Sequence, residues 1–317
     1  MLDCNSLYIT TGNLNKKSTL LVVEEMNVFT IKDLENLSGI KAHTIRIWEQ
    51  RYTFLKPGRT DTNIRYYCNQ ELKTILNISL LNKYGFKISH IDRMSEEELA
   101  LKVISLSDKE ARQEKMVNDL IAFMIDLDLL AFEQTLDRMI LSGGIDKTIN
   151  QLIFPFLDRI GILWLTNHIY PAQEHLVTNI IRQKLMVGID GAVAHRQVDK
   201  TLVLFLPEGE YHELGLLYVY YLLRHHGAQV LYLGADTPLK DVEFVCKYKN
   251  PDYLYTHLTG IAGSFNFEKF LTQAARLMPW IPLIISGQLA RTQLKKIPAG
   301  VNFKQNLAEV LEFVAKL

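Results

Sequence analysis

The sequence predicts three folded parts in a row: a head of short helices with a β-wing, a helical bundle, and an α/β domain with a parallel sheet. Three observations predict this order. Residues 28–97 hold short, well-delimited helical patterns, residues 98–195 hold almost no strand signal, and residues 198–317 alternate strand and helix patterns. A length of 317 residues fits two or three domains. Residues 1–27 show no sustained periodicity, and we expect a tail there.

The composition is that of a globular protein without a global charge. Hydrophobic residues make up 48% and charged residues 22%, and 35 Lys and Arg balance 35 Asp and Glu. A site for a polyanion must therefore be a local basic patch. The three cysteines lie far apart without a C-x-x-C, which favours a reducing compartment over a disulfide framework. No stretch fits a signal peptide or a bilayer span, so we expect a cytoplasmic protein without membrane contact.

Capping signals delimit the first of two consecutive helices in the head. "FTIKDLENLSGI" places Thr30 before the first helix and Ser38-Gly39 after it, and "KAHTIRIWEQRY" follows as the second. The next segment, "FLKPGRTDTNIRYY", is punctuated by Pro and Gly and ends in β-prone residues, which favours a hairpin wing. Two helices joined by a tight turn and followed by a wing predict a winged helix-turn-helix.

The other two parts differ in their periodicity. In residues 98–195, apolar residues recur at three- and four-residue intervals, which predicts a bundle of the four-helix type. From residue 201 onward, helices alternate with the strand patterns "TLVLFLP", "AQVLYLG", "DYLYTHL", "PLIISG" and "VNFK". This alternation predicts a flavodoxin-like (Rossmann-like) parallel sheet. Ligands of such sheets bind beyond the carboxyl ends of the strands.

A basic cluster covers the second helix and the wing. Residues 41–67 contain six Lys or Arg against two acids, in a chain whose net charge is zero. Neutralising DNA phosphates needs such a cluster, although a solvated charged helix explains the charge count alone. The side chains of the second helix that can reach bases or phosphates include Lys41, His43, Thr44, Arg46 and Arg51.

The order of these features resembles the N-terminal domain of the MerR family of transcription regulators. The resemblance assigns three residues to the major groove and its backbone, Thr44, Arg46 and Arg51. It assigns three more to the flanking phosphates, Arg59, Arg65 and Tyr66. Ile45 and Trp48 are expected in the core. Because members of this family bind as dimers, the implied partner is a double-stranded, pseudo-palindromic operator.

The stretch "EGEYHELG" follows the first predicted strand of the α/β domain and contains E-x-H-x-x-G at Glu210, His212 and Gly215. A neutral imidazole is a good transition-metal ligand, and a nearby carboxylate can hold its other nitrogen. Glycine at the third position lets a cofactor or a backbone approach closely. Taken alone, the pattern is also that of a surface histidine at the start of a helix.

Two later motifs complete a succession that resembles the cobalamin-binding pattern D-x-H-x-x-G, S-x-L and G-G. Here Glu replaces Asp, Thr replaces Ser, and Ser-Gly replaces Gly-Gly. In that family the histidine displaces the cofactor's own benzimidazole from cobalt, and the nucleotide tail runs down a slot. The resemblance makes His212 the lower axial ligand and Glu210 the residue that orients it. The walls of the tail slot would be Thr256, Leu258, Ser286 and Gly287.

The bundle carries a third match, W-x9-E-H, at Trp164, Glu174 and His175. It resembles the helical cap of light-sensing, cobalamin-dependent MerR-type repressors, the CarH/LitR group. There the Trp covers the upper ligand of adenosylcobalamin, and the Glu and His contact the adenosyl group. Taken singly, Trp164 fits ordinary bundle core, and Glu174 and His175 fit a polar helix start.

One position departs from the photosensory pattern. The residue after the cap Trp is a His in that group and ligates cobalt once light removes the adenosyl group, whereas this chain has Leu165. Leucine cannot ligate a metal, so another ligand, such as His168, His175 or water, would have to replace it. The departure weakens the expectation of photoreception and leaves that of cofactor binding untouched.

Together the resemblances span residues 28–317 and imply a DNA-binding repressor, not an enzyme, that is controlled by cobalamin. Adenosylcobalamin is the expected form, with methylcobalamin as the alternative. We expect the cofactor to build an oligomer, a dimer or tetramer, whose paired heads grip DNA more tightly. Two alternatives stay open. In one, the cobalamin-like domain works without cofactor as an oligomerisation or partner-binding module; in the other, the chain is a corrinoid methyl-transfer protein.

Overall fold

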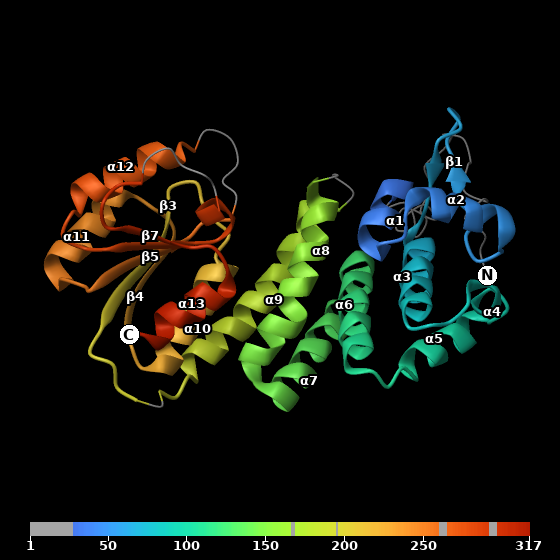
Figure 1. Ribbon diagram of the computed structural model, residues 1–317, viewed down its shortest axis with the longest axis horizontal. Helices are drawn as coiled ribbons and strands as arrows, with labels where there is room; N and C mark the ends of the chain where they lie inside the picture. Colours follow the sequence, from blue (N-terminus) through green and yellow to red (C-terminus); the bar gives the residue numbers. More distant parts are fainter. Residues whose placement is uncertain (1–27, 166–168, 195, 260–264, 292–296) are drawn as a thin grey trace, which may run out of the picture. The chain divides into compact units, whose positions relative to one another are not determined.

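The structure is a computed structural model of the chain (Figure 1). It describes residues 28–165, 169–194, 196–259, 265–291 and 297–317, apart from the side chains of residues 162–165. The tail expected over residues 1–27 lies outside this part. Contacts divide the chain into two compact units, Met1–Asn179 and Ile180–Leu317.

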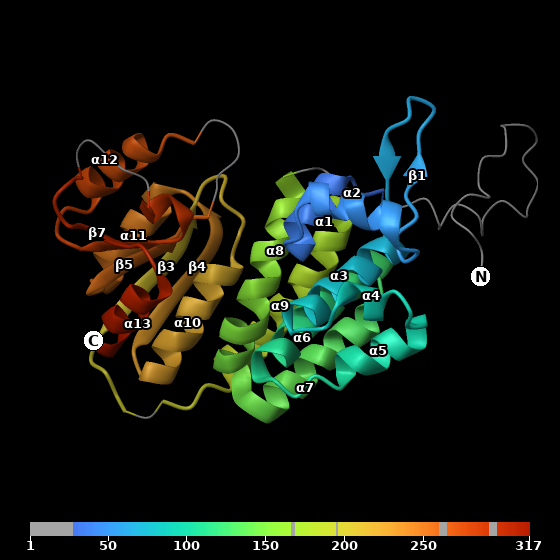
Figure 2. The ribbon, with the colours of Figure 1, turned by 45° about the vertical axis from the view of Figure 1, so that its right-hand side comes forward.

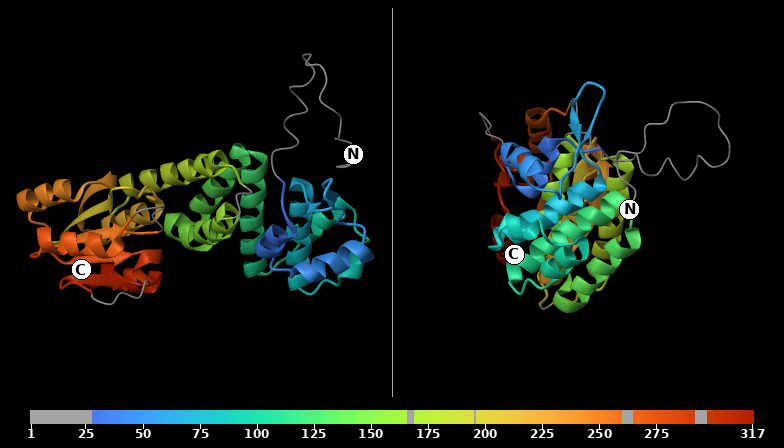
Figure 3. Two further views of the ribbon diagram at one scale, coloured as in Figure 1. Left: turned by 90° about the horizontal axis from the view of Figure 1, so that it is seen from above. Right: turned by 90° about the vertical axis from the view of Figure 1, so that its right-hand side faces the viewer.

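The head contains the two helices and the wing that the sequence predicts. Its elements are α1 (Ile31–Ser38), α2 (Ala42–Arg51), β1 (Gly58–Arg59), β2 (Arg65–Tyr66), α3 (Asn69–Lys83), α4 (Ile88–Ile91) and α5 (Glu96–Ile104). Thr30 and Asp33 cap α1 reciprocally, and Gly39 ends it with a φ of 74°. The strands β1 and β2 pair antiparallel, and the hairpin that they form projects beyond the helices of the head (Figures 2 and 3).

Long helices form the bundle, as the three- and four-residue apolar spacing predicts. They are α6 (Lys109–Asp126), α7 (Leu129–Thr148), the π-helix η1 (Ile149–Ile153), α8 (Phe154–Leu165) and α9 (Pro171–Asp190). The apolar stretch from Met116 to Leu141 is interrupted where Leu127 adopts a φ of 57° and Asp128 caps α7. Phe132 and Phe156 pack edge to face in the core, with ring centroids 5.4 Å apart.

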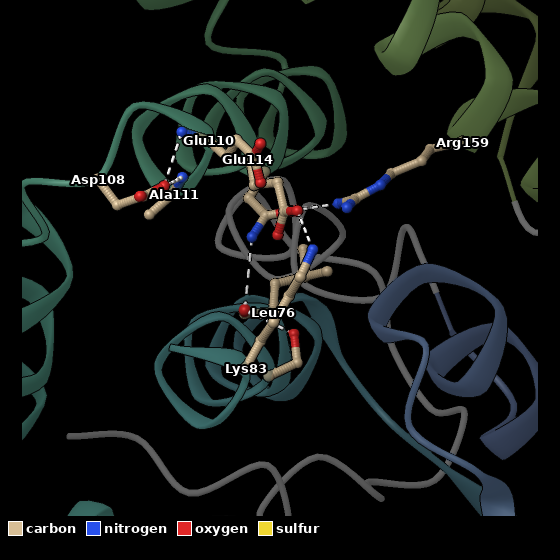
Figure 4. A network of polar contacts seen from close by, with 9 residues as sticks. Leu76, Lys83, Asp108, Glu110, Ala111, Glu114 and Arg159 are labelled. Atoms are coloured by element: carbon tan, nitrogen blue, oxygen red, sulfur yellow. Dashed lines mark hydrogen bonds and ion pairs between the residues drawn. The ribbon is translucent and has the colours of Figure 1, made fainter. Parts of the chain in front are cut away.

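A polar network joins the head to the bundle within the first unit (Figure 4). Asn118 of α6 donates from Nδ2 to the carbonyl of Leu76 in α3 at 3.4 Å, and its Oδ1 accepts from Arg159 of α8. One turn earlier on α6, Glu114 pairs with Lys83 of α3. Burial lowers the pKa of Arg159, and the nearby charge of Glu114 opposes this shift. Three helices that bury apolar surface therefore also share specific polar contacts.

The second unit is a five-stranded parallel sheet covered by helices on both faces (Figure 1). Its strands are β3 (Thr201–Pro207), β4 (Gln229–Thr237), β5 (Tyr253–His257), β6 (Leu283–Ser286) and β7 (Val301–Lys304), in the spatial order β4-β3-β5-β6-β7. Its helices are α10 (Leu214–His226), α11 (Leu239–Lys249), α12 (Phe267–Leu277), the 3-10 helix η2 (Gln288–Arg291) and α13 (Leu307–Ala315). This is the flavodoxin-like order that the sequence predicts. The segment "ARTQLKKI" (residues 290–297) also has a helical pattern, and its residues 292–296 lie outside the described part of the chain.

Alternation along β5 divides its side chains between two cores. Tyr255 packs with residues of α10 and α13, whereas Leu254 and Leu258 pack with residues of α11 and α12. The strand order reverses between β3 and β5, because β3 is followed along the chain by β4 on its other side. Ligands of doubly wound sheets bind at such a switch point, beyond the carboxyl ends of the strands.

None of the described helices is both long enough and apolar enough to cross a membrane.

Candidate functional site

Helix α2 presents a basic face to solvent and an apolar face to the core. Ile45 is fully buried and Trp48 is 7% exposed, which confirms both as core residues. The cations expected to contact DNA are exposed. Its exposed residues include Lys41 at the N-cap, His43, Arg46 and Arg51, while Thr44 is half-buried.

The wing adds a further cation to this surface. Arg59 is exposed on β1, and its guanidinium donates to the Asn63 side chain at 2.7 Å across the turn of the hairpin. Asn63 itself has a φ of 64°, which a short polar side chain tolerates in a tight turn. The recognition helix and the wing therefore both carry exposed positive charge, as phosphate contacts require.

Two other wing residues make contacts inside the head. Arg65 donates from Nε to Oε2 of Glu49 on α2 at 2.9 Å, and Tyr67 donates its hydroxyl to the other oxygen of the same carboxylate. The ring of Tyr66 lies against Gly58, where an added Cβ would come within 2.2 Å of the ring. Arg65 thus helps to hold the wing on α2, Tyr66 packs within the wing, and the contacts of both with phosphates stay a prediction. As one of two acids among the basic residues 41–67, Glu49 could have been predicted to pair with a nearby cation.

In the second unit, the loop between β3 and α10 brings Glu210 and His212 together as the sequence predicts. The Glu210 side chain is fully buried, and its Oε1 lies 2.5 Å from Nδ1 of His212. The backbone N–H groups of Tyr211 and His212 donate to the same oxygen at 3.0 Å. Burial raises the pKa of Glu210, but the hydrogen bonds from His212 outweigh it and leave the pKa below its ordinary value. Glu210 is therefore a buried carboxylate ion at neutral pH.

This carboxylate fixes how the imidazole of His212 is presented. The side chain is 52% exposed, and Nδ1 is the ring atom that lies against the buried carboxylate. With its Nδ1–H donated to Glu210, the neutral ring carries its lone pair on Nε2, which is the form that ligates a metal. Asp236, on β4, braces the loop by accepting from the backbone N–H of Gly209 at 2.9 Å.

Gly215 begins a close contact between α10 and β5. A Cβ at this position would lie 2.3 Å from Cδ2 and Nε2 of His257, so only glycine leaves room for that ring. Nδ1 of His257 is 2.8 Å from the hydroxyl of Ser286, which is the partner of His257 in the β5–β6 register. The structure therefore brings Gly215 and Ser286 to opposite sides of one half-buried histidine.

Thr256 and Leu258 point to the other face of the sheet. Thr256 is fully buried, and its hydroxyl has no hydrogen-bond partner among the described residues. Gly287 has a φ of 94° and packs against the backbone of Leu258, where a Cβ would lie 2.3 Å from the carbonyl oxygen. The residue beside Gly215 is thus His257 and not Thr256. The two-residue alternation of a strand could have indicated this, since Thr256 and Leu254 share a face.

The acid and the histidine of the helical cap lie in the first turn of α9. Gln173, just before them, anchors this turn by donating to the carbonyl of Ile125 at 3.0 Å. Glu174 is 25% exposed and His175 is 70% exposed, with 3.7 Å between Oε2 and Nδ1. The side chain of Trp164, in the last turn of α8, lies outside the described residues, as do those of Leu165 and His168.

The polar atoms around His212 fit a large cofactor with its own metal. Among the described residues, no three His, Cys, Asp or Glu side chains form a metal cage. A corrin ring supplies the equatorial ligands of its cobalt, so one imidazole on a carboxylate is the donor set that it needs. Two buried oxygens beside this pair, Oε2 of Glu210 and Oγ1 of Thr259, have no partner among the described residues and could meet polar groups of a ligand.

Comparison with known families places two domains on the chain. Residues 29–98 match the family described as "MerR HTH family regulatory protein". Residues 116–187, which cover α7, η1 and α8 with most of α6 and α9, match the family described as "B12 binding domain". The two matched regions are the head and the helical bundle, so the chain combines a MerR-type helix-turn-helix with a B12-binding domain.

Two curated relatives extend over most of the chain, and a solved structure supports the fold. The HTH-type transcriptional repressor CarH of Myxococcus xanthus is 27% identical over 272 residues, covering 83% of this chain and 90% of the relative. CarA of the same organism, also an HTH-type transcriptional repressor, is 25% identical over 284 residues, covering 89% and 94%. The monomethylamine corrinoid protein of Methanosarcina barkeri is 15% identical with a TM-score of 0.53, covering 64% of this chain and 99% of that protein.

Proposed function

We propose that this chain, which joins a MerR-type helix-turn-helix to a B12-binding domain, is a DNA-binding transcriptional repressor controlled by cobalamin. The observation that carries the proposal is the Glu210–His212 pair at the carboxyl end of β3. A fully buried carboxylate that orients a half-exposed imidazole is the arrangement of a metal-ligating histidine with its supporting acid. Two repressors similar over most of the chain support the regulatory role.

In this proposal the residues of the second unit hold the lower side of the cofactor. His212 would ligate cobalt through Nε2, and Glu210 would orient the ring by accepting from Nδ1–H, which leaves the lone pair of the neutral ring on Nε2. When bound, the cofactor supplies a cobalt centre whose upper ligand differs between its forms. We assign adenosylcobalamin as the native form, with Trp164, Glu174 and His175 toward the adenosyl group, and methylcobalamin as the alternative. Leu165 cannot ligate cobalt, so a response to light would need another upper ligand after photolysis.

The head supplies the partner surface for double-stranded DNA. Exposed cations on α2 and on the wing would neutralise phosphates on the two sides of a major-groove contact. One such head reads only a short half-site, so tight binding requires two or more heads on one operator. Assembly into a dimer or tetramer would join the heads and raise the apparent affinity without any new base contact. Cofactor binding controls repression if it favours that assembly.

The test measures DNA binding in four samples of full-length protein. Duplexes are first selected from a random pool with the adenosylcobalamin-loaded protein in darkness. Binding of the selected duplex is then measured for apo protein, loaded protein in darkness, loaded protein after green light, and His212→Ala treated with cofactor. We expect the loaded dark sample to bind at least about tenfold more tightly than the apo and His212→Ala samples, a typical allosteric coupling.

The matched control is His90→Ala, which removes a histidine exposed in the first unit and should behave as the unmodified protein. Equal DNA binding by all samples would refute cofactor control. Absence of any selected duplex would refute the DNA-binding role. A cofactor-free oligomerisation module would give DNA binding that is unchanged by cobalamin and by His212→Ala, while methyl transfer without duplex selection would indicate a corrinoid enzyme.

A further inference from the structure

The ring of His257 lies against Gly215, the glycine of the E-x-H-x-x-G motif. The third residue of the E-x-H-x-x-G motif is Gly215, and a Cβ there would lie 2.3 Å from Cδ2 and Nε2 of His257 and 2.8 Å from Cε1. Three ring atoms at this range show that the imidazole points its outer edge at the glycine. The space that the glycine provides is therefore filled by a side chain of β5.

A relay of hydroxyl groups holds the ring in that position. Tyr255, which is fully buried, donates its hydroxyl to Oγ of Ser286 at 2.8 Å. Since that oxygen accepts from Tyr255, its own hydrogen is available to Nδ1 of His257, also at 2.8 Å. The ring is then neutral with its hydrogen on Nε2, the edge that faces Gly215. Burial lowers the pKa of His257 to about 4, in agreement with a neutral ring at pH 7.

Of the four residues that the resemblance assigns to the slot for a nucleotide tail, Ser286 is in contact with this ring. Gly215 and Ser286 belong to two different motifs of the cobalamin-type pattern, and the structure puts His257 in contact with both. The buried unpartnered oxygens of Glu210 and Thr259 border the same end of the sheet. A tail that passes Gly215 cannot share this space with the ring, because atoms of the ring already lie at contact distance from the glycine.

We propose that His257 is a specificity-determining residue of the corrinoid site, which sets how strongly the protein favours corrinoids that carry a nucleotide tail. This inference rests on the proposed function. Binding a tail displaces the ring from Gly215 and breaks its hydrogen bond to Ser286. A corrinoid without a tail, such as cobinamide, leaves both contacts in place. The residue therefore lowers the affinity for tailed corrinoids and leaves that for tailless corrinoids unchanged.

The experiment compares cobalamin with cobinamide in the full-length protein. Dissociation constants for both are measured by absorption titration for the unmodified protein, His257→Ala, His257→Asn and the control His90→Ala. Asparagine keeps an acceptor for Ser286 but lacks the outer edge of the ring, so it separates blocking from hydrogen bonding. We expect both variants at residue 257 to bind cobalamin about tenfold more tightly, the equivalent of one hydrogen bond, with cobinamide changed less than about threefold.

A second readout does not depend on the variants folding well. With ¹⁵N-labelled histidine, the ring signals of His257 should change when cobalamin is added to the unmodified protein and stay in place with cobinamide. The inference is overturned if the ratio of the two dissociation constants is the same with and without the ring, or if both corrinoids move the His257 signals alike. If neither corrinoid binds with an absorption change that requires His212, it is the proposed function that fails.

Discussion

The carboxylate of Glu49 on α2 binds two residues that follow the turn of the wing, and its removal tests how much these contacts stabilise the head. It accepts from Nε of Arg65 at 2.9 Å and from the hydroxyl of Tyr67. Tyr67 is fully buried, while the side chain of Arg65 is 29% exposed. Burial, followed by the hydrogen bond to Glu49, raises the pKa of Tyr67 above its ordinary value, so its hydroxyl stays a donor at neutral pH.

The expected magnitude follows from what each variant leaves unpaired. Glu49→Ala strands the buried hydroxyl of Tyr67, which costs about 1–3 kcal/mol of unfolding free energy. Arg65 keeps contact with water and adds under about 1 kcal/mol. Tyr67→Phe alone loses one charge-assisted hydrogen bond, also about 1–3 kcal/mol. In the Glu49→Ala background Tyr67→Phe should be nearly neutral, since no acceptor is left, so the coupling energy is about 1–3 kcal/mol.

The assay is urea unfolding of the head in the full-length chain. Trp48 lies in the core of the head beside Phe54, so Trp164→Phe and Trp280→Phe leave a fluorophore that reports on this part alone. The four proteins of the double-mutant cycle are compared in that background. The reasoning is refuted if Tyr67→Phe costs the same with and without Glu49, to within about 0.5 kcal/mol.

Three further outcomes are expected. Arg46→Ala removes an exposed cation of α2 and should reduce, by about one, the magnitude of the slope of log K against log salt concentration, where K is the binding constant for the selected duplex. Lys32→Ala, which removes an exposed cation of α1, is the control. An unchanged slope would show that Arg46 does not contact DNA phosphates. Asn118→Ala removes the hydrogen-bond acceptor of the Arg159 guanidinium and should reduce the unfolding free energy by about 1–3 kcal/mol. Asn179→Ala, at an exposed position, should have no effect. Equal effects of the two variants would show that the network does not stabilise the fold. In the folded protein His257 stays neutral down to about pH 4, whereas in the unfolded chain the same ring is protonated below about pH 6.5. Unfolding free energy that is present above pH 6.5 is therefore lost as the pH falls, by up to about 3 kcal/mol. His257→Gln should remove this part of the pH dependence in a denaturant series.

Local rules made most of the fold predictable from the sequence. Thr30 and Gly39 delimit α1 by capping chemistry that depends only on neighbouring residues. Strand β7 (Val301–Lys304) coincides with the predicted segment, because a short β-prone run after Pro and Gly has few other conformations. The break between α6 and α7 was less evident, since Leu127 takes its left-handed conformation inside an unbroken apolar pattern.

The candidate site could be predicted only where its contacts are local in sequence. Glu210 and His212 are two residues apart, and the loop that holds them brings their side chains together. The contact of Gly215 with His257 joins residues that are far apart in the chain. Which side chain of β5 reaches the glycine depends on which face of the sheet each residue of the strand occupies. The pairing of Glu49 with Arg65 and Tyr67 likewise depends on how the wing folds back onto α2.

The central claim is that the Nε2 atom of His212 ligates cobalt, and electron paramagnetic resonance of bound cob(II)alamin tests it most directly. An axial ¹⁴N nucleus splits each cobalt line into a triplet and an axial ¹⁵N nucleus into a doublet. With unlabelled cofactor and ¹⁵N-histidine protein, our account predicts a doublet that disappears in His212→Ala. A triplet in the labelled protein would show that the cofactor's own base remains on cobalt, and that result would contradict the account.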